Sequence, residues 1–203
     1  MIDEGYIKFD SHWQKTGALD YAEIESLNRW RRPLYDAGLI GHYEDLGIGF
    51  GNLSVRAGEE GQFIISGSQT GHLPELGAQH YALVEEYDIE QNRVYSTGAT
   101  EASSESMTHA AIYELDPAIG AIAHVHSEDL WAVLKGSAAT TDAEVTFGTP
   151  GMAREFQRLW TESDFRETGI AVMAGHESGL VSTGSNLQEA AERILAIDAK
   201  FRN

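Results

Sequence analysis

The segment that most limits what this chain can fold into is AIGAIAHVHSEDLW, residues 118–131, an apolar run that contains two histidines. Its small and β-branched residues, from Ala121 to Val125, are typical of a buried strand. His124 and His126 are two residues apart, so on a strand their imidazoles leave the same face, roughly 6.5–7 Å apart along the backbone. This spacing indicates either two rings that converge on one metal ion or two half-buried histidines that each bind a carbonyl.

The composition restricts both the ligands and the partners of such a site. The chain has 203 residues and no cysteine, and its 32 acidic and 14 basic residues give a formal net charge of −18. Without cysteine there are no disulfides, thiolate metal sites or cysteine nucleophiles, and His, Asp and Glu remain as ligands. A field of this sign repels phosphate backbones and anionic lipid, so we expect neither nucleic acid nor membranes as partners. A small anionic substrate remains compatible, because backbone N–H groups or a metal can bind it locally.

The sequence predicts one domain over residues 1–203, in which about 1–18 form a loosely docked N-terminal arm. There is no repeat, low-complexity tract or Pro/Gly/Ser linker, and the length lies within the range of single domains. The segment MIDEGYIKFDSHWQK is no secretory signal, and no apolar run reaches the ~18 residues needed to span a bilayer. We therefore expect a cytoplasmic protein.

Helices and hairpin strands alternate along the chain. Helices are predicted where apolar residues recur at the helical period, over residues 19–39, 102–117, 149–163 and 186–203. Strand pairs separated by turns are predicted over residues 50–67, 80–98 and 169–184. Gly38 and Pro117 are helix stop signals, and Pro150 is expected in the first turn of its helix. This order predicts an α/β sandwich with a mixed, largely antiparallel sheet.

Two further residues complete a candidate site with the histidine pair. His176, in VMAGHESGL, follows an apolar run and can project from a strand end into a cleft. A His-x-His pair with one distant histidine makes a three-nitrogen site with an open fourth position, the arrangement that catalytic zinc uses. Glu105, in ASSESM, lies at a predicted helix start, where a carboxylate is also favoured by the helix dipole alone. Ser103 and Ser104, just before it, have an alternative role as N-caps.

Four segments resemble the class II aldolase/adducin family: GNLSVR, TGHLPEL, SSESMTHAAIYELDPAIGAIAHVHS and GLVSTGSNLQEAAERI. The match runs from about Trp30 to the C-terminus. The order of motifs is specific: Gly-Asn-hydrophobic-Ser, then Ser-Ser-Glu, then Tyr-x-x-x-Pro before His-x-His, then a last histidine. The resemblance implies a three-layer α/β/α sandwich around a mixed sheet, and a homotetramer of fourfold symmetry with active sites between neighbouring subunits.

The resemblance also implies roles for individual residues. His124, His126 and His176 would hold one divalent ion per chain, with zinc expected and manganese, cobalt or iron as alternatives. Glu105 would coordinate the metal before substrate binds, or act as acid/base once substrate displaces it. Hydroxyl and backbone N–H groups would bind a substrate phosphate at six positions: Gly51, Asn52, Thr70, Gly71, Ser103 and Ser104. His109 also matches a family position, and we expect it to be structural.

Two segments depart from the family pattern. GHESGL is one residue longer before Gly-Leu than the usual His-His-Gly arrangement, so either the loop bulges or the third ligand registers differently. ISGSQTG carries an extra residue against the usual Thr-Pro-x-Gly pattern, so we expect a reshaped anion pocket. Both changes bear on the identity of the substrate more than on metal binding.

The predicted function is that of a metal-dependent aldolase-type lyase. It would cleave or form a carbon–carbon bond in a small hydroxy-carbonyl substrate, phosphorylated or not, through a metal-stabilised enediolate. A carboxylate near the metal would move the proton.

Several alternatives remain. Epimerase, dehydratase and decarboxylase reactions use the same site. A non-catalytic, adducin-like interaction module is disfavoured because Glu105 and all three histidines are retained. A cupin-type oxygenase is disfavoured by the long helices between the motifs.

Overall fold

The computed structural model describes residues 5–20, 22–58 and 61–202. Its strands are β1 (Asp10–Lys15), β2 (Gly41–Tyr43), β3 (Ile48–Phe50), β4 (Asn52–Arg56), β5 (Phe63–Ser66), β6 (Tyr81–Asp88), β7 (Arg93–Gly98), β8 (Ala121–His126), β9 (Ala139–Thr140), β10 (Ile170–Val172) and β11 (Gly179–Gly184). Nine of them form one sheet in the order β1-β7-β6-β5-β4-β8-β11-β10-β9, and β2 and β3 form a separate hairpin. The pairs β1–β7 and β9–β10 are parallel, and the other pairs in the sheet are antiparallel. The predicted mixed, largely antiparallel sheet is confirmed.

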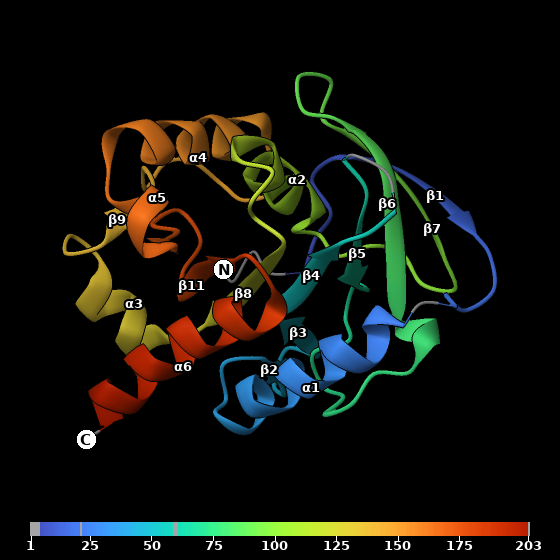
Figure 1. Ribbon diagram of the computed structural model, residues 1–203, viewed down its shortest axis with the longest axis horizontal. Coiled ribbons are helices and arrows are strands. Elements are labelled where there is room, and N and C mark those ends of the chain that lie inside the picture. The colour runs from blue at the N-terminus through green and yellow to red at the C-terminus, as the bar shows by residue number, and fades with distance from the viewer. Residues whose placement is uncertain (1–4, 21, 59–60, 203) are drawn as a thin grey trace.

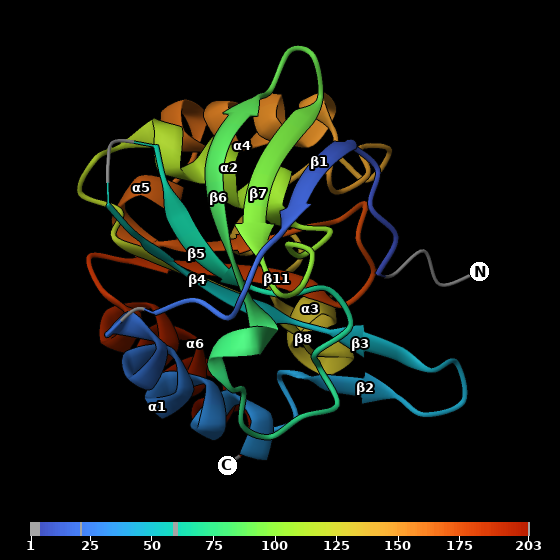
Figure 2. The same ribbon diagram turned by 90° about the vertical axis from the view of Figure 1, so that its right-hand side faces the viewer.

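Helices cover both faces of this sheet. They are α1 (Glu23–Asp36), α2 (Ser106–Leu115), α3 (Glu128–Leu134), α4 (Pro150–Glu162), α5 (Phe165–Thr168) and α6 (Leu187–Arg202), with a short 3₁₀ turn at Ala78–His80. Figure 1 and Figure 2 show α2, α4 and α5 on one face and α1, α3 and α6 on the other. The molecule is therefore the expected three-layer α/β/α sandwich. In the part of the chain that the structure describes, no helix is long and apolar enough to cross a bilayer.

Side chains of the central strand β8 alternate between two hydrophobic cores. Ala123 and Val125 pack in the core beneath α1 and α6, whereas Ile122 packs in the core beneath α2 and α4. Because successive side chains of a strand point to opposite faces, His124 and His126 lie on the same face as Ile122. The apolar run predicted to be a buried strand is thus buried on both faces, and its two histidines face α2 and α4.

The predicted end of α1 and the predicted start of α4 are observed, whereas α2 begins later than predicted. Gly38 follows the C-cap of α1 and has φ 74°, a left-handed conformation that suits glycine. Pro150 is the first residue of α4, whose N-cap Thr149 accepts a hydrogen bond from the Met152 N–H. The helix predicted from residue 102 begins only at Ser106, because Ser103 to Glu105 form a turn before it.

The N-terminal segment is more ordered than the predicted loosely docked arm. Residues 10–15 form β1, which pairs with β7 from Asp10↔Arg93 to Lys15↔Gly98. Phe9, just before this strand, is buried in the core beneath α2 and α4. The prediction is therefore wrong for these residues, and residues 1–4 lie outside the described part of the chain.

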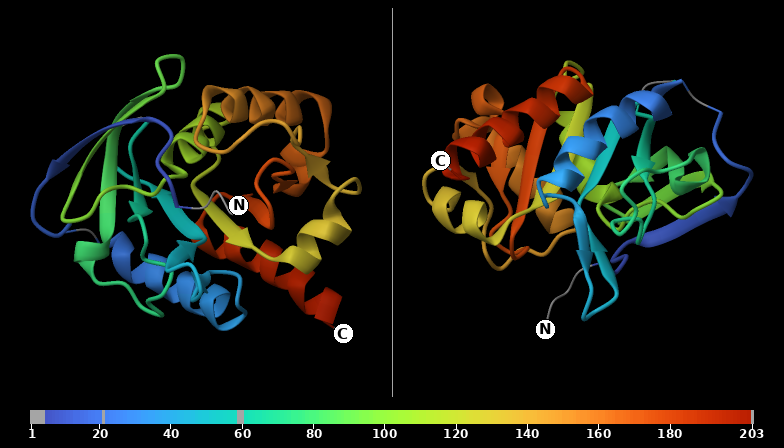
Figure 3. Two further views of the ribbon diagram at one scale, coloured as in Figure 1. Left: turned by 180° about the vertical axis from the view of Figure 1, so that it is seen from behind. Right: turned by 90° about the horizontal axis from the view of Figure 1, so that it is seen from below.

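The β2–β3 hairpin, which the sequence did not predict, projects from the body of the molecule (Figure 2, Figure 3).

Candidate active site

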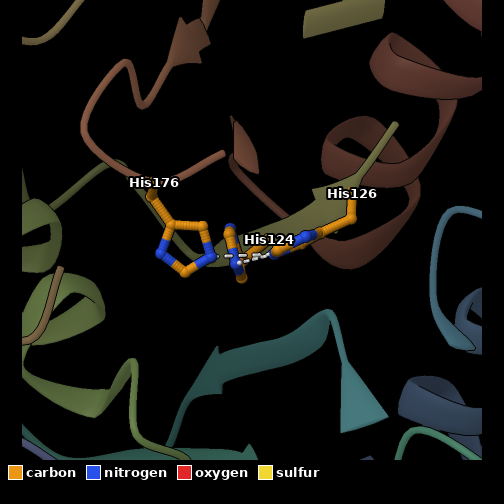
Figure 4. Close-up of side chains that lie close together, drawn as sticks. All are labelled: His124, His126 and His176. Atoms are coloured by element: carbon orange, nitrogen blue, oxygen red, sulfur yellow. Dashed lines mark hydrogen bonds between the residues drawn. The ribbon is translucent and has the colours of Figure 1, made fainter. Parts of the chain in front are cut away.

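Three histidine rings meet at the end of β8. His124 and His126 come from this strand, and His176 comes from the loop between β10 and β11 (Figure 4). The Nε2 atom of His126 lies 3.1 Å from Nε2 of His124 and 2.9 Å from Nε2 of His176. All three side chains are buried, with exposed fractions of 1%, 3% and 4%. The structure therefore brings together the three residues that the sequence singled out as metal ligands.

Each ring has a polar atom near its other nitrogen. Nδ1 of His124 lies 3.1 Å from the carbonyl oxygen of Leu180, to which only an N–H can donate. Nδ1 of His126 lies 3.3 Å from the hydroxyl of Tyr43, and Nδ1 of His176 lies 3.2 Å from Oε1 of Glu105. Contacts of this kind fix the tautomer and the orientation of metal-binding histidines. The Leu180 carbonyl requires the N–H of His124 at Nδ1, so the Nε2 lone pair of His124 is directed at Nε2 of His126.

The three Nε2 atoms fit a divalent ion better than they fit each other. A neutral imidazole that donates from Nδ1 has only a lone pair at Nε2, so neighbouring Nε2 atoms repel unless a proton or a metal lies between them. A tetrahedral zinc site with Zn–N bonds of 2.0–2.1 Å places its ligand nitrogens about 3.3 Å apart. The observed Nε2 separations of 2.9 and 3.1 Å are close to this value. His124, His126 and His176 could therefore hold one divalent metal.

The electrostatic surroundings keep His124 ready to bind a metal. Burial is the main cause that holds the pKa of His124 well below 6.5, and the neighbouring His126 and His176 lower it further. A metal ligand must be the neutral imidazole, so protons compete weakly with a metal at this ring.

The loop that carries His176 accommodates its extra residue without moving the ring away. The His176 N–H donates to the carbonyl oxygen of Met173 and the Gly179 N–H donates to that of His176, which closes a tight turn. Ser178, one of the two residues between His176 and Gly179, takes a left-handed conformation with φ 65°. A Cβ at Gly179 would lie 2.6 Å from Cδ2 of His176, so only glycine leaves room for the ring. The loop therefore bulges, and the third histidine still reaches the pair.

Glu105 lies beside the cluster, at the N-cap of α2. Its Oε1 atom is 3.2 Å from Nδ1 of His176 and 3.9 Å from Nε2 of His124, and its side chain is 1% exposed. Its N–H donates to the hydroxyl oxygen of Ser103 at 3.2 Å within the turn before the helix, and Ser103 is not the N-cap that its alternative role would require. The carboxylate is thus close to the three histidines and to any metal or ligand that binds beside them.

A small polar cavity of about 20 Å³ contains all six predicted anion-binding residues. They are Gly51, Asn52, Thr70, Gly71, Ser103 and Ser104, and Gly5, Gly49, Gly67, Ser68 and Gln69 complete the lining. Asn52 pairs with His124 across β4 and β8, and Ser104 precedes Glu105 in the chain, so the cavity adjoins the histidine cluster. The Thr70 hydroxyl donates to the carbonyl oxygen of Gly67, so that among the six predicted residues Ser103, Ser104 and Asn52 remain as side-chain donors for a ligand.

Two residues that the sequence did not single out shape this cavity. Arg31, on α1, is 2% exposed and donates to the carbonyl oxygens of Thr70 and Leu73. Its positive charge therefore lies behind the cavity loop, although its position among the apolar residues of a helix gave no sign of this. Gln69 has φ 60°, and its Oε1 accepts the Gly49 N–H at 3.0 Å. The segment with the extra residue thus forms part of the cavity rim.

The fold and the site define a mixed α/β protein whose three buried histidines, beside a carboxylate, could bind a divalent metal. The particular family follows from the sequence: the profile described as "Class II Aldolase and Adducin N-terminal domain" matches residues 45–202. The chain belongs to this family. None of the curated proteins matches the chain at a significant level.

Solved structures of the family share the fold. L-fuculose 1-phosphate aldolase superimposes with a TM-score of 0.67 at 18% identity, over 91% of this chain and 85% of that chain. The L-fuculose-1-phosphate aldolase from Thermus thermophilus gives 0.63 at 18% identity, over 90% and 92%. YgbL from Klebsiella pneumoniae, described only as an aldolase, epimerase or decarboxylase, gives 0.65 at 22% identity, over 88% and 86%. At these identities the likeness establishes the fold alone.

Proposed function

We propose that this protein is a metal-dependent lyase of the aldolase type. It would cleave or form a carbon–carbon bond next to the carbonyl of a small hydroxy-carbonyl compound. The observation that carries the proposal is the convergence of three buried Nε2 atoms beside the carboxylate of Glu105, within 3.2 Å of its nearest histidine nitrogen. Membership of the class II aldolase and adducin family supports it.

The three histidines would hold one divalent ion per chain. Zinc is the expected ion, because three imidazoles without a competing thiol form the ligand set of many catalytic zinc sites, and manganese, cobalt and iron are the alternatives. When bound, such an ion supplies a Lewis acid that stabilises negative charge developing on substrate oxygens. The N–H of His124 at Nδ1 and the contacts of the other two rings keep the three nitrogens in place.

Glu105 is the proposed acid/base. Its Oε1 atom lies 3.2 Å from Nδ1 of His176, and its burial keeps competing water away. From this position the carboxylate would take the proton from the carbon next to the substrate carbonyl, or return it. Proton transfer by a positioned group is worth typically ~10²–10⁴-fold in rate.

The polar cavity is the proposed binding site for a phosphate or carboxylate of the substrate. The hydroxyls of Ser103 and Ser104 and the amide of Asn52 would donate to it, together with backbone N–H groups near Gly51, Thr70 and Gly71. Such neutral donors bind anions without a lysine in the cavity. The charge of −18 on the whole chain therefore does not oppose an anionic substrate.

A substrate screen on the zinc-loaded protein tests this proposal. Small aldehydes would be combined with hydroxyketones such as dihydroxyacetone phosphate, and condensation products would be followed by mass spectrometry, with His124→Ala as the metal-free control. We expect product from the wild type and none from the control. Conversion between stereoisomers, loss of water or release of carbon dioxide without condensation would point instead to an epimerase, dehydratase or decarboxylase. A metal-loaded protein that turns over nothing would favour a non-catalytic, adducin-like module.

We also propose that the protein acts in the cytoplasm as a homotetramer with its active sites between subunits. The support is the family resemblance of the motifs that surround the histidines. Light scattering of the purified protein measures the mass directly, and a monomeric mass with full activity would contradict this arrangement.

A further inference from the structure

A chain of three buried polar side chains lies behind the candidate active site. The Ser54 Oγ atom, on β4, is 2.7 Å from Nδ1 of His109 and 2.7 Å from the hydroxyl of Tyr113, both on α2. The exposed fractions are 0% for Ser54 and His109 and 2% for Tyr113. Burial lowers the pKa of His109 to about 3, so its imidazole is neutral at ordinary pH and carries one N–H and one lone pair.

Counting protons decides which nitrogen of His109 carries the N–H. If Nδ1–H donated to Ser54 and Ser54 to Tyr113, the Tyr113 proton would have no acceptor among the residues that the structure describes. If Tyr113 donates to Ser54 and Ser54 donates to Nδ1, both hydroxyl protons are used. Either order leaves one donor without a partner in the described chain, but the first order also leaves the Nε2 lone pair of His109 unpaired, so the second satisfies more of these buried groups. The N–H of His109 therefore lies at Nε2.

This N–H has no partner within the described chain. Nε2 of His109 is sealed from bulk solvent and makes no hydrogen bond to the described residues. Because the side chains of a helix lean towards its N-terminus, the ring extends over the preceding turn, which begins at Glu105. Glu105 lies one helical turn before His109, since the His109 backbone N–H donates to the Glu105 carbonyl oxygen at 3.0 Å. His109 is also near enough to His124 to contribute to the lowering of the pKa of His124, after burial and the two other cluster histidines.

We propose that His109 is a positioning residue of the active site. Its Nε2–H holds one oxygen atom next to Glu105, either that of a bound water or that of a substrate hydroxyl that replaces it. Ser54 and Tyr113 fix the tautomer that makes this possible. The inference rests on the proposed function, in which Glu105 moves the proton.

Two substitutions of His109 separate positioning from packing. The amide nitrogen of glutamine reaches the place of Nε2, whereas the amide oxygen of asparagine reaches the place of Nδ1, where it can accept from Ser54. His109→Gln thus keeps a donor near Glu105 and loses the bond to Ser54, and His109→Asn does the reverse. We expect His109→Gln to keep kcat within about tenfold and His109→Asn to lose about 10²-fold in kcat with little change in KM. Both should keep their metal.

The opposite order of the two variants would overturn the proposal. A purely structural role requires the bond to Ser54, so His109→Asn would then be the active and more stable variant. Equal loss in both variants, with equal loss of stability, would also contradict positioning.

A measurement without turnover tests the same inference independently of the reaction. Long-range ¹H–¹⁵N NMR of the full chain reports which ring nitrogen of His109 is protonated. We expect the proton at Nε2 between pH 5 and pH 8, and we expect Ser54→Ala to disturb this preference. A proton at Nδ1 in the wild type would contradict the proposal, whereas the expected tautomer in a protein without lyase activity would contradict only the proposed reaction.

Discussion

The two faces of the central sheet bury different kinds of side chain. Beneath α1 and α6, β8 contributes Ala121, Ala123 and Val125, all fully buried in an apolar core. Beneath α2 and α4, the same strand contributes His124 and His126. Burial of apolar surface stabilises the fold, whereas burial of polar groups is unfavourable unless they are paired. One face therefore holds the strand in place, and the other can be used for chemistry.

The polar face continues onto the neighbouring strand. Asn52 and Ser54 of β4 lie on the side that faces α2, where Ser54 contacts His109, while Leu53 between them packs in the core beneath α1 and α6. Substitutions at adjacent positions of one strand should thus have effects of different kinds. The predictions below use this contrast.

The largest effect is expected from the adjacent pair Val125 and His126. His126→Ala should reduce the bound divalent metal from about one per chain to almost none after mild chelation, because two of the three nitrogens bind poorly alone. Val125→Ala should keep metal and turnover but lower the free energy of unfolding by about 2 kcal/mol, through lost apolar burial and the cavity left behind. Metal analysis and urea denaturation measure both. Full metal occupancy in His126→Ala would break the comparison.

A smaller effect is expected at the polar cavity. Ser104→Ala removes one donor to the proposed anion, and a hydrogen bond to a charged group contributes roughly 1.5–3 kcal/mol. We therefore expect KM to rise at least about tenfold for an anionic substrate, with little change for a neutral analogue of the same length. Steady-state kinetics with both substrates measure this difference. Equal changes in the two KM values would show that Ser104 does not contact an anion.

The smallest effect concerns acid stability, and it follows from the pKa of His109, which burial lowers to about 3. In the unfolded chain this pKa is about 6.5, so below pH 6.5 the unfolded chain binds a proton that the folded chain does not. The free energy of unfolding then falls as pH falls from 6.5 towards 3. Without metal, the free energy of unfolding of His109→Gln should fall by about 1 kcal/mol less than that of the wild type when the pH is lowered from 7 to 5.5. Urea denaturation measures both proteins. If the free energies of unfolding of the wild type and of His109→Gln fell equally with pH, burial would not keep His109 neutral.

The architecture was predictable where the sequence repeats a clear pattern. The long helices α1, α4 and α6 show the helical period, and β8 is an uninterrupted apolar run. Strand β1 was missed because it lies at an edge and its side chains are mostly exposed, so no apolar alternation marks it. The β2–β3 hairpin was missed because its three-residue strands are too short to show a period.

The candidate site was predictable to the extent that its chemistry is local. The His-x-His spacing on a strand and the Ser-Ser-Glu turn before a helix are visible in the sequence, and the structure brings these residues together with His176. The groups that orient them were not predictable, because they are distant in sequence. The carbonyl of Leu180, the hydroxyl of Tyr43 and the buried Arg31 act only through contacts that the folded chain creates.

The most direct test of the whole account is the variant Glu105→Gln. Glutamine keeps the volume of the side chain and an oxygen that can accept from Nδ1 of His176, but it cannot take up a proton. We predict that the variant keeps its metal and its assembly, loses ~10²–10⁴-fold in turnover, and no longer exchanges deuterium from solvent into the carbon next to the substrate carbonyl. Wild-type exchange in a metal-loaded Glu105→Gln protein would contradict the assignment of Glu105 as the acid/base.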